Sequence, residues 1–175
     1  LPGRLEAVRT AQVRARVEGV VERRLFVEGS DVQAGKSLYS IDARSYRAAL
    51  AAAEAELAVA NLTVERYRSL LEDKAVSQQE FDQAAARVKQ AEAALVKARL
   101  DLENANVPAP ISGRIGRSMI TEGALVGKGE ATLLATIEQT DPIYANFTQS
   151  NSEAMRLRQA FNSGASRPSE GGQVE

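Results

Sequence analysis

Residues 44–106 read RSYRAALAAAEAELAVANLTVERYRSLLEDKAVSQQEFDQAAARVKQAEAALVKARLDLENAN, and this stretch decides the fold. Apolar or small residues recur in it every seven positions, in two offset rows on each side of a break near Asp73. Such rows form the seam of a coiled coil, because a repeat of about 3.5 residues keeps one stripe facing a partner helix. The pattern therefore predicts two long helices folded back on each other. The rows are Tyr46, Ala53, Ala60, Tyr67 with Leu50, Leu57, Val64, Leu71, and then Phe81, Val88, Leu95, Leu102 with Ala84, Ala91, Ala98, Ala105.

The break itself carries a helix-start signal. Ser77 followed by Glu80 matches a capping box, in which the serine hydroxyl and the glutamate carboxylate satisfy unpaired N–H groups. Neither Gly nor Pro occurs between Lys36 and Val107, which suits uninterrupted helices. Each helix of roughly 30 residues would be about 45 Å long. A hairpin buried in a larger bundle is the alternative, but charged outer positions such as Glu54 argue for a solvated hairpin.

Composition excludes several function classes. The 175 residues contain no His and no Cys, which removes histidine bases, Cys or Ser nucleophiles paired with His, and Cys/His zinc sites. The 22 basic and 23 acidic residues are interleaved, so no basic patch indicates nucleic acid. No apolar run approaches the ~20 residues needed to cross a bilayer. The sequence predicts a non-catalytic protein with no cofactor and no metal, and its first residues suggest a fragment or a processed form.

The segments before and after residues 44–106 repeat each other. Shifting the numbering by 94 matches two runs that alternate with a period of two, which is typical of strands. Matched glycines predict matched tight turns or close backbone approaches. Two similar halves would then pack on each other, with the helical hairpin inserted between them. The matched pairs are Val13/Val107, Ala15/Ala109, Val17/Ile111, Gly19/Gly113, Val21/Ile115, Glu28/Glu122, Gly29/Gly123, Val32/Val126 and Gly35/Gly129.

The outer segments predict part of a third unit. Asp141-Pro142 is read as a break, followed by an alternating strand over residues 143–148. Ser150 and Glu153 match a second capping box, which would open a short helix through Phe161.

Together these features resemble the periplasmic adaptors, or membrane fusion proteins, of tripartite efflux pumps, especially the AcrA/MexA branch. The resemblance rests on the split halves around the hairpin, on PISGRIGRS at 110–118 and TEGALV at 121–126, and on Asp141-Pro142-Ile143-Tyr144. It implies an α+β fold: an elongated modular chain with an antiparallel coiled-coil hairpin inserted in a split lipoyl-like β-sandwich, plus part of a β-barrel. The implied domains are lipoyl-like at 13–42 and 107–137, hairpin at 43–106, and incomplete barrel at 1–12 and 138–175.

The resemblance also implies a function and a contact site. Such a protein would lie in the periplasm, held at the inner membrane by a segment outside this chain. It would link an inner-membrane resistance–nodulation–division (RND) transporter to a TolC-like outer-membrane channel and self-associate into a trimeric or hexameric ring. The family's Arg-x3-Leu-x6-Ser pattern near the hairpin tip, which meets the channel, matches Arg66, Leu70 and Ser77. Ser77 as a helix cap, Leu70 as a packing residue and Arg66 as a solvated charge are the structural alternatives.

Two other functions remain open from the sequence. A lipoyl or biotin carrier with a coiled-coil spacer would need a modifiable Lys at the turn between the halves. The hairpin replaces that turn, and Lys36 and Lys128 fall in other loops. A type I secretion adaptor of the same family would be expected to carry a far longer hairpin.

Overall fold

The computed structural model describes residues 3–129 and 131–147, together with Met155 and Gln159. The chain divides into two units, residues 9–139 and residues 1–8 with 140–175. The predicted second capping box and short helix lie outside the described residues, apart from Met155 and Gln159, which are helical. The domain boundaries predicted from the sequence stay a prediction.

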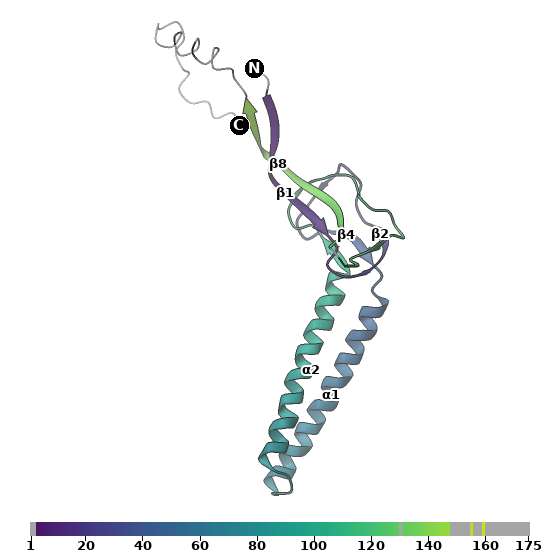
Figure 1. The fold of residues 1–175 in the computed structure, drawn as a ribbon, viewed down its shortest axis with the longest axis vertical. Coiled ribbons are helices and arrows are strands. Elements are labelled where there is room, and N and C mark those ends of the chain that lie inside the picture. The colour runs from purple at the N-terminus through teal and green to yellow at the C-terminus, as the bar shows by residue number, and fades with distance from the viewer. Residues whose placement is uncertain (1–2, 130, 148–154, 156–158, 160–175) are drawn as a thin grey trace. The chain divides into compact units, whose positions relative to one another are not determined.

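The α+β fold class is confirmed. The chain runs through β1 (Gly3–Arg14), β2 (Gly19–Arg24), β3 (Asp31–Val32), β4 (Ser37–Ile41), α1 (Arg44–Glu72), α2 (Gln78–Asn104), β5 (Asn106–Pro108), β6 (Gly113–Ile115), β7 (Leu125–Val126) and β8 (Leu133–Phe147). Figure 1 shows α1 and α2 side by side and joined by a short turn. Four strands precede the hairpin and four follow it.

The internal repeat is visible in the sheet order. One sheet has the order β1-β8-β6-β3 and the other has β5-β4-β2-β7. Exchanging each strand for its repeat equivalent (β1 for β5, β2 for β6, β3 for β7, β4 for β8) converts the first order into the second. Each sheet therefore takes two strands from each half, so the halves are interleaved rather than stacked as separate sheets.

Backbone hydrogen bonds obey the same exchange. Gly29 N donates to Ile115 O at 2.9 Å, and its equivalent Gly123 N donates to Val21 O at 2.8 Å. Both glycines have positive φ, +75° and +86°, which residues with a Cβ adopt only at a cost. The matched tight turn predicted from these two glycines is confirmed.

Two equivalent glutamates, one in each half, accept hydrogen bonds from the backbone of the other half. Glu28 Oε1 accepts the backbone N–H of Ser118 at 2.9 Å, and its equivalent Glu122 Oε1 accepts that of Arg24 at 2.8 Å. In each case a carboxylate of one half satisfies a backbone donor of the other. Separating the halves would therefore break both hydrogen bonds.

The core lies between the two sheets. Its side chains with the least exposure are aliphatic, and Leu38, Ile115, Leu134 and Ile137 are all 0% exposed. Tyr39 adds an edge-to-face contact with Phe26, and its hydroxyl donates to Leu134 O at 3.0 Å. Burial raises the pKa of Tyr39. Apart from half-buried Tyr46 at the root, no residue of α1 or α2 belongs to this core or packs against it, so the helices do not cover the sheets.

The predicted seam is confirmed except at its last residue, Ala105, which follows α2 and is buried in the core of the β layers. The fifteen predicted seam residues that lie in α1 and α2 are all buried or half-buried, and the most buried are alanines, with Ala53, Ala84 and Ala91 at 9%, 5% and 4% exposed. Small side chains let two helix axes approach closely, as the alanine rows predicted.

One expectation is wrong. Strand β8 runs through Asp141-Pro142 without a break. Proline lacks an N–H and is tolerated in a strand only where no ladder bond is needed. Strand β6 pairs with β8 only at Ile137 and Glu138, so by Pro142 that side of β8 needs no donor. Within the unit that includes residues 1–8 and 140–147, Asn146 Nδ2 donates to Glu6 Oε2 at 2.8 Å.

Candidate functional site at the tip of the helical hairpin

The end of α1 forms a Schellman turn. Lys74 N donates to Leu71 O at 3.0 Å, and Ala75 N donates to Leu70 O at 2.8 Å, the paired bonds that define this helix ending. The position that normally holds Gly in such a turn is Lys74, with φ of +56°. The left-handed conformation costs a residue with a Cβ roughly 1–2 kcal/mol. Strain of this kind often accompanies a functional surface.

The start of α2 is a complete capping box, as predicted. Glu80 N donates to Ser77 Oγ at 3.3 Å, and Ser77 N donates to Glu80 Oε2 at 2.8 Å. The Ser77 hydroxyl itself donates to the same carboxylate oxygen at 2.9 Å. The hydrogen bond from the Ser77 backbone N–H lowers the pKa of Glu80 most, and the bond from the Ser77 hydroxyl lowers it further.

The tip thus has two rigid ends and a short turn, residues 73–77, between them. The N–H groups of Lys74, Ala75 and Ser77 have partners, although the turn is exposed except at half-buried Val76. A partner would meet a surface already ordered in the free protein, which reduces the entropy cost of binding.

The structure brings two of the three predicted contact residues together. Arg66 and Leu70 are four residues apart on α1 and so share one face of the helix. Arg66 is exposed, and its side chain has no hydrogen bond or ion pair among the described residues. Leu70 is half-buried. Ser77 belongs to the other helix, and no hydrogen bond among the described residues joins it to Arg66 or Leu70.

Each side chain offers a different contact. The Arg66 guanidinium presents forked donors suited to carboxylates and carbonyls. Leu70 supplies part of an apolar surface beside the seam residue Leu71. Because the Ser77 hydroxyl proton already binds Glu80, an incoming group would donate to the Ser77 oxygen or displace Glu80. The capping role of Ser77 is therefore established, and its contact role stays a prediction.

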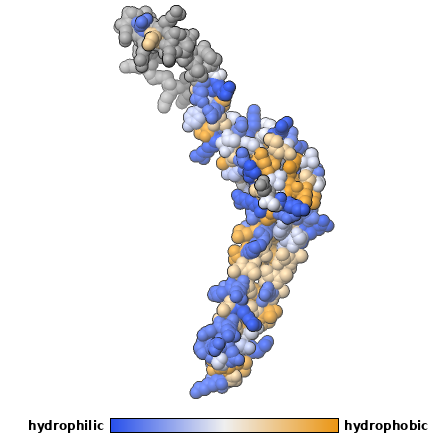
Figure 2. Space-filling model, in the orientation of Figure 1, coloured by the Kyte–Doolittle hydropathy of each residue, from blue (hydrophilic) through white to orange (hydrophobic). Residues whose placement is uncertain are grey.

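An uncharged stripe on α1 leads toward this site and was missed in the sequence, where the outer positions were read as densely charged. Its members follow a spacing of four and three residues along the face opposite the seam, and all are exposed, with Val59 and Leu62 at 64% and 60%. Arg66 continues the same spacing toward the tip. In Figure 2 the part of the hairpin next to the sheets is largely orange and tan, and blue residues gather toward the tip. The stripe comprises Ala48, Ala52, Ala55, Val59 and Leu62.

A shallow groove of about 540 Å³ runs beside the stripe, between the two helices. Its floor consists of small residues, including Ala60, Ala84 and Ala91, and its rim carries Glu56 and Arg87. From the alanine rows the sequence predicted a close approach of the helices. It did not predict the groove that these small side chains leave beside the seam.

No group of three or more Asp or Glu among the described residues is placed to hold a metal ion. Within that same part of the chain, neither helix is both long and apolar enough to cross a membrane. Lys36 and Lys128 are exposed in loops of the β layers, and neither occupies the connection between the halves, which is the hairpin.

Comparison with known proteins agrees with this arrangement. Residues 9–138 match the family model described as "RND MFP, barrel-sandwich hybrid domain". The chain is 51% identical over 178 residues to the Escherichia coli (strain K12) multidrug export protein AcrE, covering 94% of this chain and 46% of AcrE. It is 51% identical over 164 residues to the antibiotic efflux pump periplasmic linker protein ArpA of Pseudomonas putida, covering 94% of this chain and 44% of ArpA.

A solved structure shares the fold. The MacA–MexA chimeric protein that contains the Pseudomonas aeruginosa MexA α-hairpin domain superposes with a TM-score of 0.71 at 30% identity, covering 78% of this chain and 50% of the chimera. The present chain spans a little under half the length of the curated relatives it matches.

Proposed function

Because this chain belongs to the family of RND membrane fusion proteins, which are adaptors rather than enzymes, we propose that it links an inner-membrane RND transporter to an outer-membrane channel. The protein would act in the periplasm, where its relatives are named as efflux pump linkers. A segment outside this chain would hold it at the inner membrane. The role of the chain would be structural, because its stiff two-helix hairpin would span part of the gap between the transporter and the channel.

The exposed, fully capped tip carries this proposal. A two-helix hairpin whose end is ordered by a Schellman turn and a capping box presents the same surface to every partner molecule. Arg66, Leu70 and Ser77 would contact a TolC-like channel, itself helical at its periplasmic end. The guanidinium would bind carboxylates or backbone carbonyls there, and Leu70 would supply apolar area.

Assembly and domain organisation extend the proposal. We assign residues 13–42 and 107–137 to a lipoyl-like domain, residues 43–106 to the hairpin, and residues 1–12 with 138–175 to an incomplete β-barrel. Copies of the lipoyl-like domain would pack into a trimeric or hexameric ring, so that several hairpin tips meet the channel together. The family relationship supports this adaptor over a lipoyl or biotin carrier. An intact-mass measurement after co-expression with a ligase would separate them, because a carrier gains the mass of its cofactor.

The test introduces Arg66→Glu, Leu70→Glu and Ser77→Glu separately into the gene that encodes this chain. Each is expected to abolish drug resistance, because each adds a negative charge to the contact surface. Circular dichroism of the purified variants should show the helix content of the parent, and Ser77→Glu should in addition lower the stability by about 1 kcal/mol, because it removes the capping hydroxyl. Arg68→Glu is the matched control, since Arg68 lies about 200° around the helix from Arg66 and points elsewhere.

Cross-linking supplies a direct readout. The chain has no Cys, so Ser77→Cys introduces a unique thiol. Cross-links from this position to an outer-membrane channel in cells are expected. Normal resistance in all three acidic variants, with no cross-link to any channel, would overturn the docking site.

A further inference from the structure

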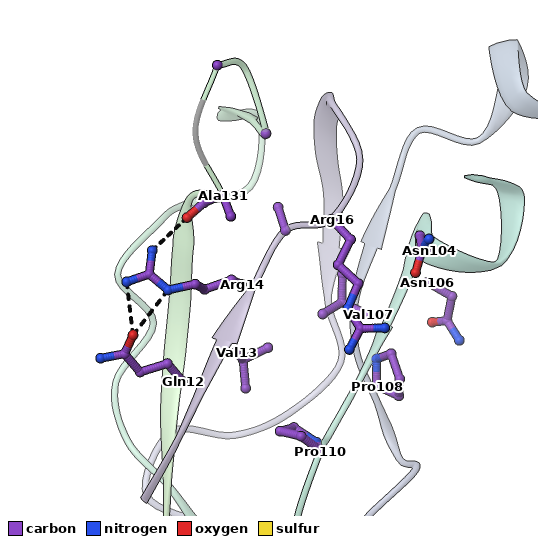
Figure 3. Close-up of a pocket in the computed structure, with 13 residues that line it drawn as sticks. Gln12, Val13, Arg14, Arg16, Asn104, Asn106, Val107, Pro108, Pro110 and Ala131 are labelled. Atoms are coloured by element: carbon purple, nitrogen blue, oxygen red, sulfur yellow. Dashed lines mark hydrogen bonds between the residues drawn. The ribbon is translucent and has the colours of Figure 1, made fainter. Parts of the chain in front are cut away.

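A second hollow lies in the β layers where α2 ends, away from the hairpin tip. It has a volume of about 530 Å³, within the range of small-molecule sites. Residues near the end of β1 line one side, and the C-terminal end of α2 with β5 lines the other (Figure 3). Val13 and Val107 are among its lining residues but are only 2% and 6% exposed, so the apolar surface comes mainly from the exposed Pro108 and Pro110. The hollow therefore combines apolar walls with the polar groups described next.

Among the residues that the structure describes, the charged side chains that line the hollow are both basic. The charged residues in the described lining are Arg14 and Arg16. Arg14 is held by neutral acceptors: Gln12 Oε1, at 3.1 Å from Nε and 2.9 Å from Nη2, and Ala131 O, at 2.7 Å from Nη1. Arg16 has no hydrogen bond or ion pair among the described residues. Within the described part of the chain no carboxylate pairs with either guanidinium, so both favour an anion in the hollow.

Amide donors stand beside Arg16. Figure 3 shows the Arg16 side chain extending toward Asn104, Asn106, Val107 and Pro108, whereas Arg14 turns away toward Gln12 and Ala131. The Oδ1 atom of Asn106 accepts a hydrogen bond from Ser37 Oγ. That bond fixes the orientation of the amide and leaves its NH₂ group free to donate. Arg16 and Asn106 thus offer unused donors on the same side of the hollow.

The end of α2 opposes an anion only weakly. The exposed carbonyls at a helix C-terminus carry about half a negative charge. Two guanidinium groups contribute two full positive charges. These two charges outweigh the partial negative charge of the helix end, so the described lining favours an anionic ligand. A ligand with one negative charge is sufficient, because Arg14 already uses much of its donor capacity on Gln12 and Ala131.

We propose that this hollow binds a small amphiphilic carboxylate. The carboxylate would take the forked donors of Arg16 and the Asn106 amide, because a guanidinium matches a carboxylate in bidentate geometry. The apolar body would lie on the exposed side chains of Pro108 and Pro110. A single acidic side chain of another protein would satisfy the charge but leave most of the 530 Å³ unfilled, which favours a free ligand.

The test titrates the 175-residue chain with 2-naphthoate and, in parallel, with the neutral isostere 2-naphthamide. The chain has no Trp, so naphthalene fluorescence can be followed without interference from indole. Saturable binding of naphthoate is expected, and the amide should bind at least about tenfold more weakly, because charge-assisted hydrogen bonds are the stronger class. Arg16→Gln is expected to weaken naphthoate binding at least about tenfold.

Arg23→Gln is the matched control, because Arg23 is an exposed arginine of the same β layers that does not line the hollow. It should leave naphthoate binding unchanged. Equal binding of naphthoate and naphthamide, retention of binding in Arg16→Gln, or no saturable binding would each overturn the proposal. If instead sedimentation shows self-association that Arg16→Gln abolishes, the anion is a carboxylate of a second copy, and the small-ligand assignment is wrong.

Discussion

The sandwich and the hairpin of this chain bury their side chains in different ways. Between the sheets, large aliphatic residues are completely enclosed, and Leu38, Ile115, Leu134 and Ile137 are 0% exposed. Within the helices, only alanines are buried, and the Leu and Val residues of the seam stay half-exposed. A two-helix layer has no third element to cover its seam.

The two regions therefore contribute different properties: the sandwich supplies most of the stability, and the hairpin supplies a long exposed surface. Enclosed aliphatic side chains each contribute about 1.5–3 kcal/mol through burial, so most of the hydrophobic stabilisation belongs to the sandwich. The hairpin gains less per residue but presents both helices to solvent along their length. A protein that makes contacts far from its core benefits from this arrangement, because the long element adds surface without enlarging the core.

The largest effect is expected from truncating one leucine in each region. Leu134→Ala should destabilise the chain by about 2–5 kcal/mol, because it empties a fully enclosed site. Leu57→Ala, at a half-exposed seam position, should cost only about 1 kcal/mol. Urea unfolding followed by circular dichroism measures both. Equal losses would mean that the seam is as well enclosed as the sandwich.

The next effect tests why the seam uses alanine. Ala91 is 4% exposed between the helices, so Ala91→Leu should force them apart and cost about 1–3 kcal/mol. Ala93→Leu, two residues further on the exposed face of α2, makes the same chemical change and should alter the stability by less than about 0.5 kcal/mol. Thermal unfolding of Ala91→Leu and Ala93→Leu compares the two stabilities. Because both variants make the same change of residue in the same helix, the difference between them reports packing at Ala91 and not helix propensity. Indistinguishable variants would contradict close packing at Ala91.

Sequence periodicity predicted the hairpin well and the sandwich less well. Heptad rows identify the buried face of a helix because neighbours three and four residues apart share that face, and fifteen of the sixteen residues predicted for the seam lie on it. The repeat of 94 residues identified equivalent strands. It could not say which strands pair, since strand partners are set by contacts between distant residues. The interleaved sheets and the continuous β8 through Pro142 therefore came only from the structure.

The candidate site, like the fold, was predicted only in part from the sequence. Ser77 and Glu80 signal their capping box locally, because both partners lie within one helical turn. The Schellman turn had no such signal, since Lys74 stands where Gly would have indicated it. The uncharged stripe ending at Leu62 was readable in principle from its spacing of four and three, but the adjacent rows of charges at other positions obscured it.

A smaller effect, opposite in sign, is expected at the turn. Lys74→Gly should stabilise the hairpin by about 0.5–1 kcal/mol, because relief of the left-handed conformation exceeds the added freedom of the unfolded chain. Lys74→Ala removes the ammonium group but keeps the Cβ, so it should bring no such gain. Amide exchange at the end of α1 reports the change. A gain in Lys74→Ala equal to that in Lys74→Gly would assign the effect to charge instead of strain.

The smallest effect concerns protons at the root of the hairpin, where the two regions join. Asp42 accepts hydrogen bonds from the side chain and from the backbone N–H of Arg44, and these lower its pKa to about 2. A lowered pKa in the folded state means that the contribution to stability is complete above the unfolded value, near 4, and is lost as the pH falls toward 2. Because Arg44 is exposed and Asp42 is only half-buried, solvent screens the pair and the change in stability should be slight.

The pKa is therefore the sharper measurement. NMR titration of the Asp42 carboxyl should give a midpoint of about 2. Arg44→Gln should raise that midpoint only part of the way to the ordinary value, because the backbone N–H of residue 44 still donates. Arg47→Gln removes a more distant charge, the weakest of the causes, and should shift it far less. An ordinary midpoint in the unaltered chain would show that Arg44 does not hold Asp42 in solution, and α1 would then begin without the carboxylate that fixes its first turn to the sandwich.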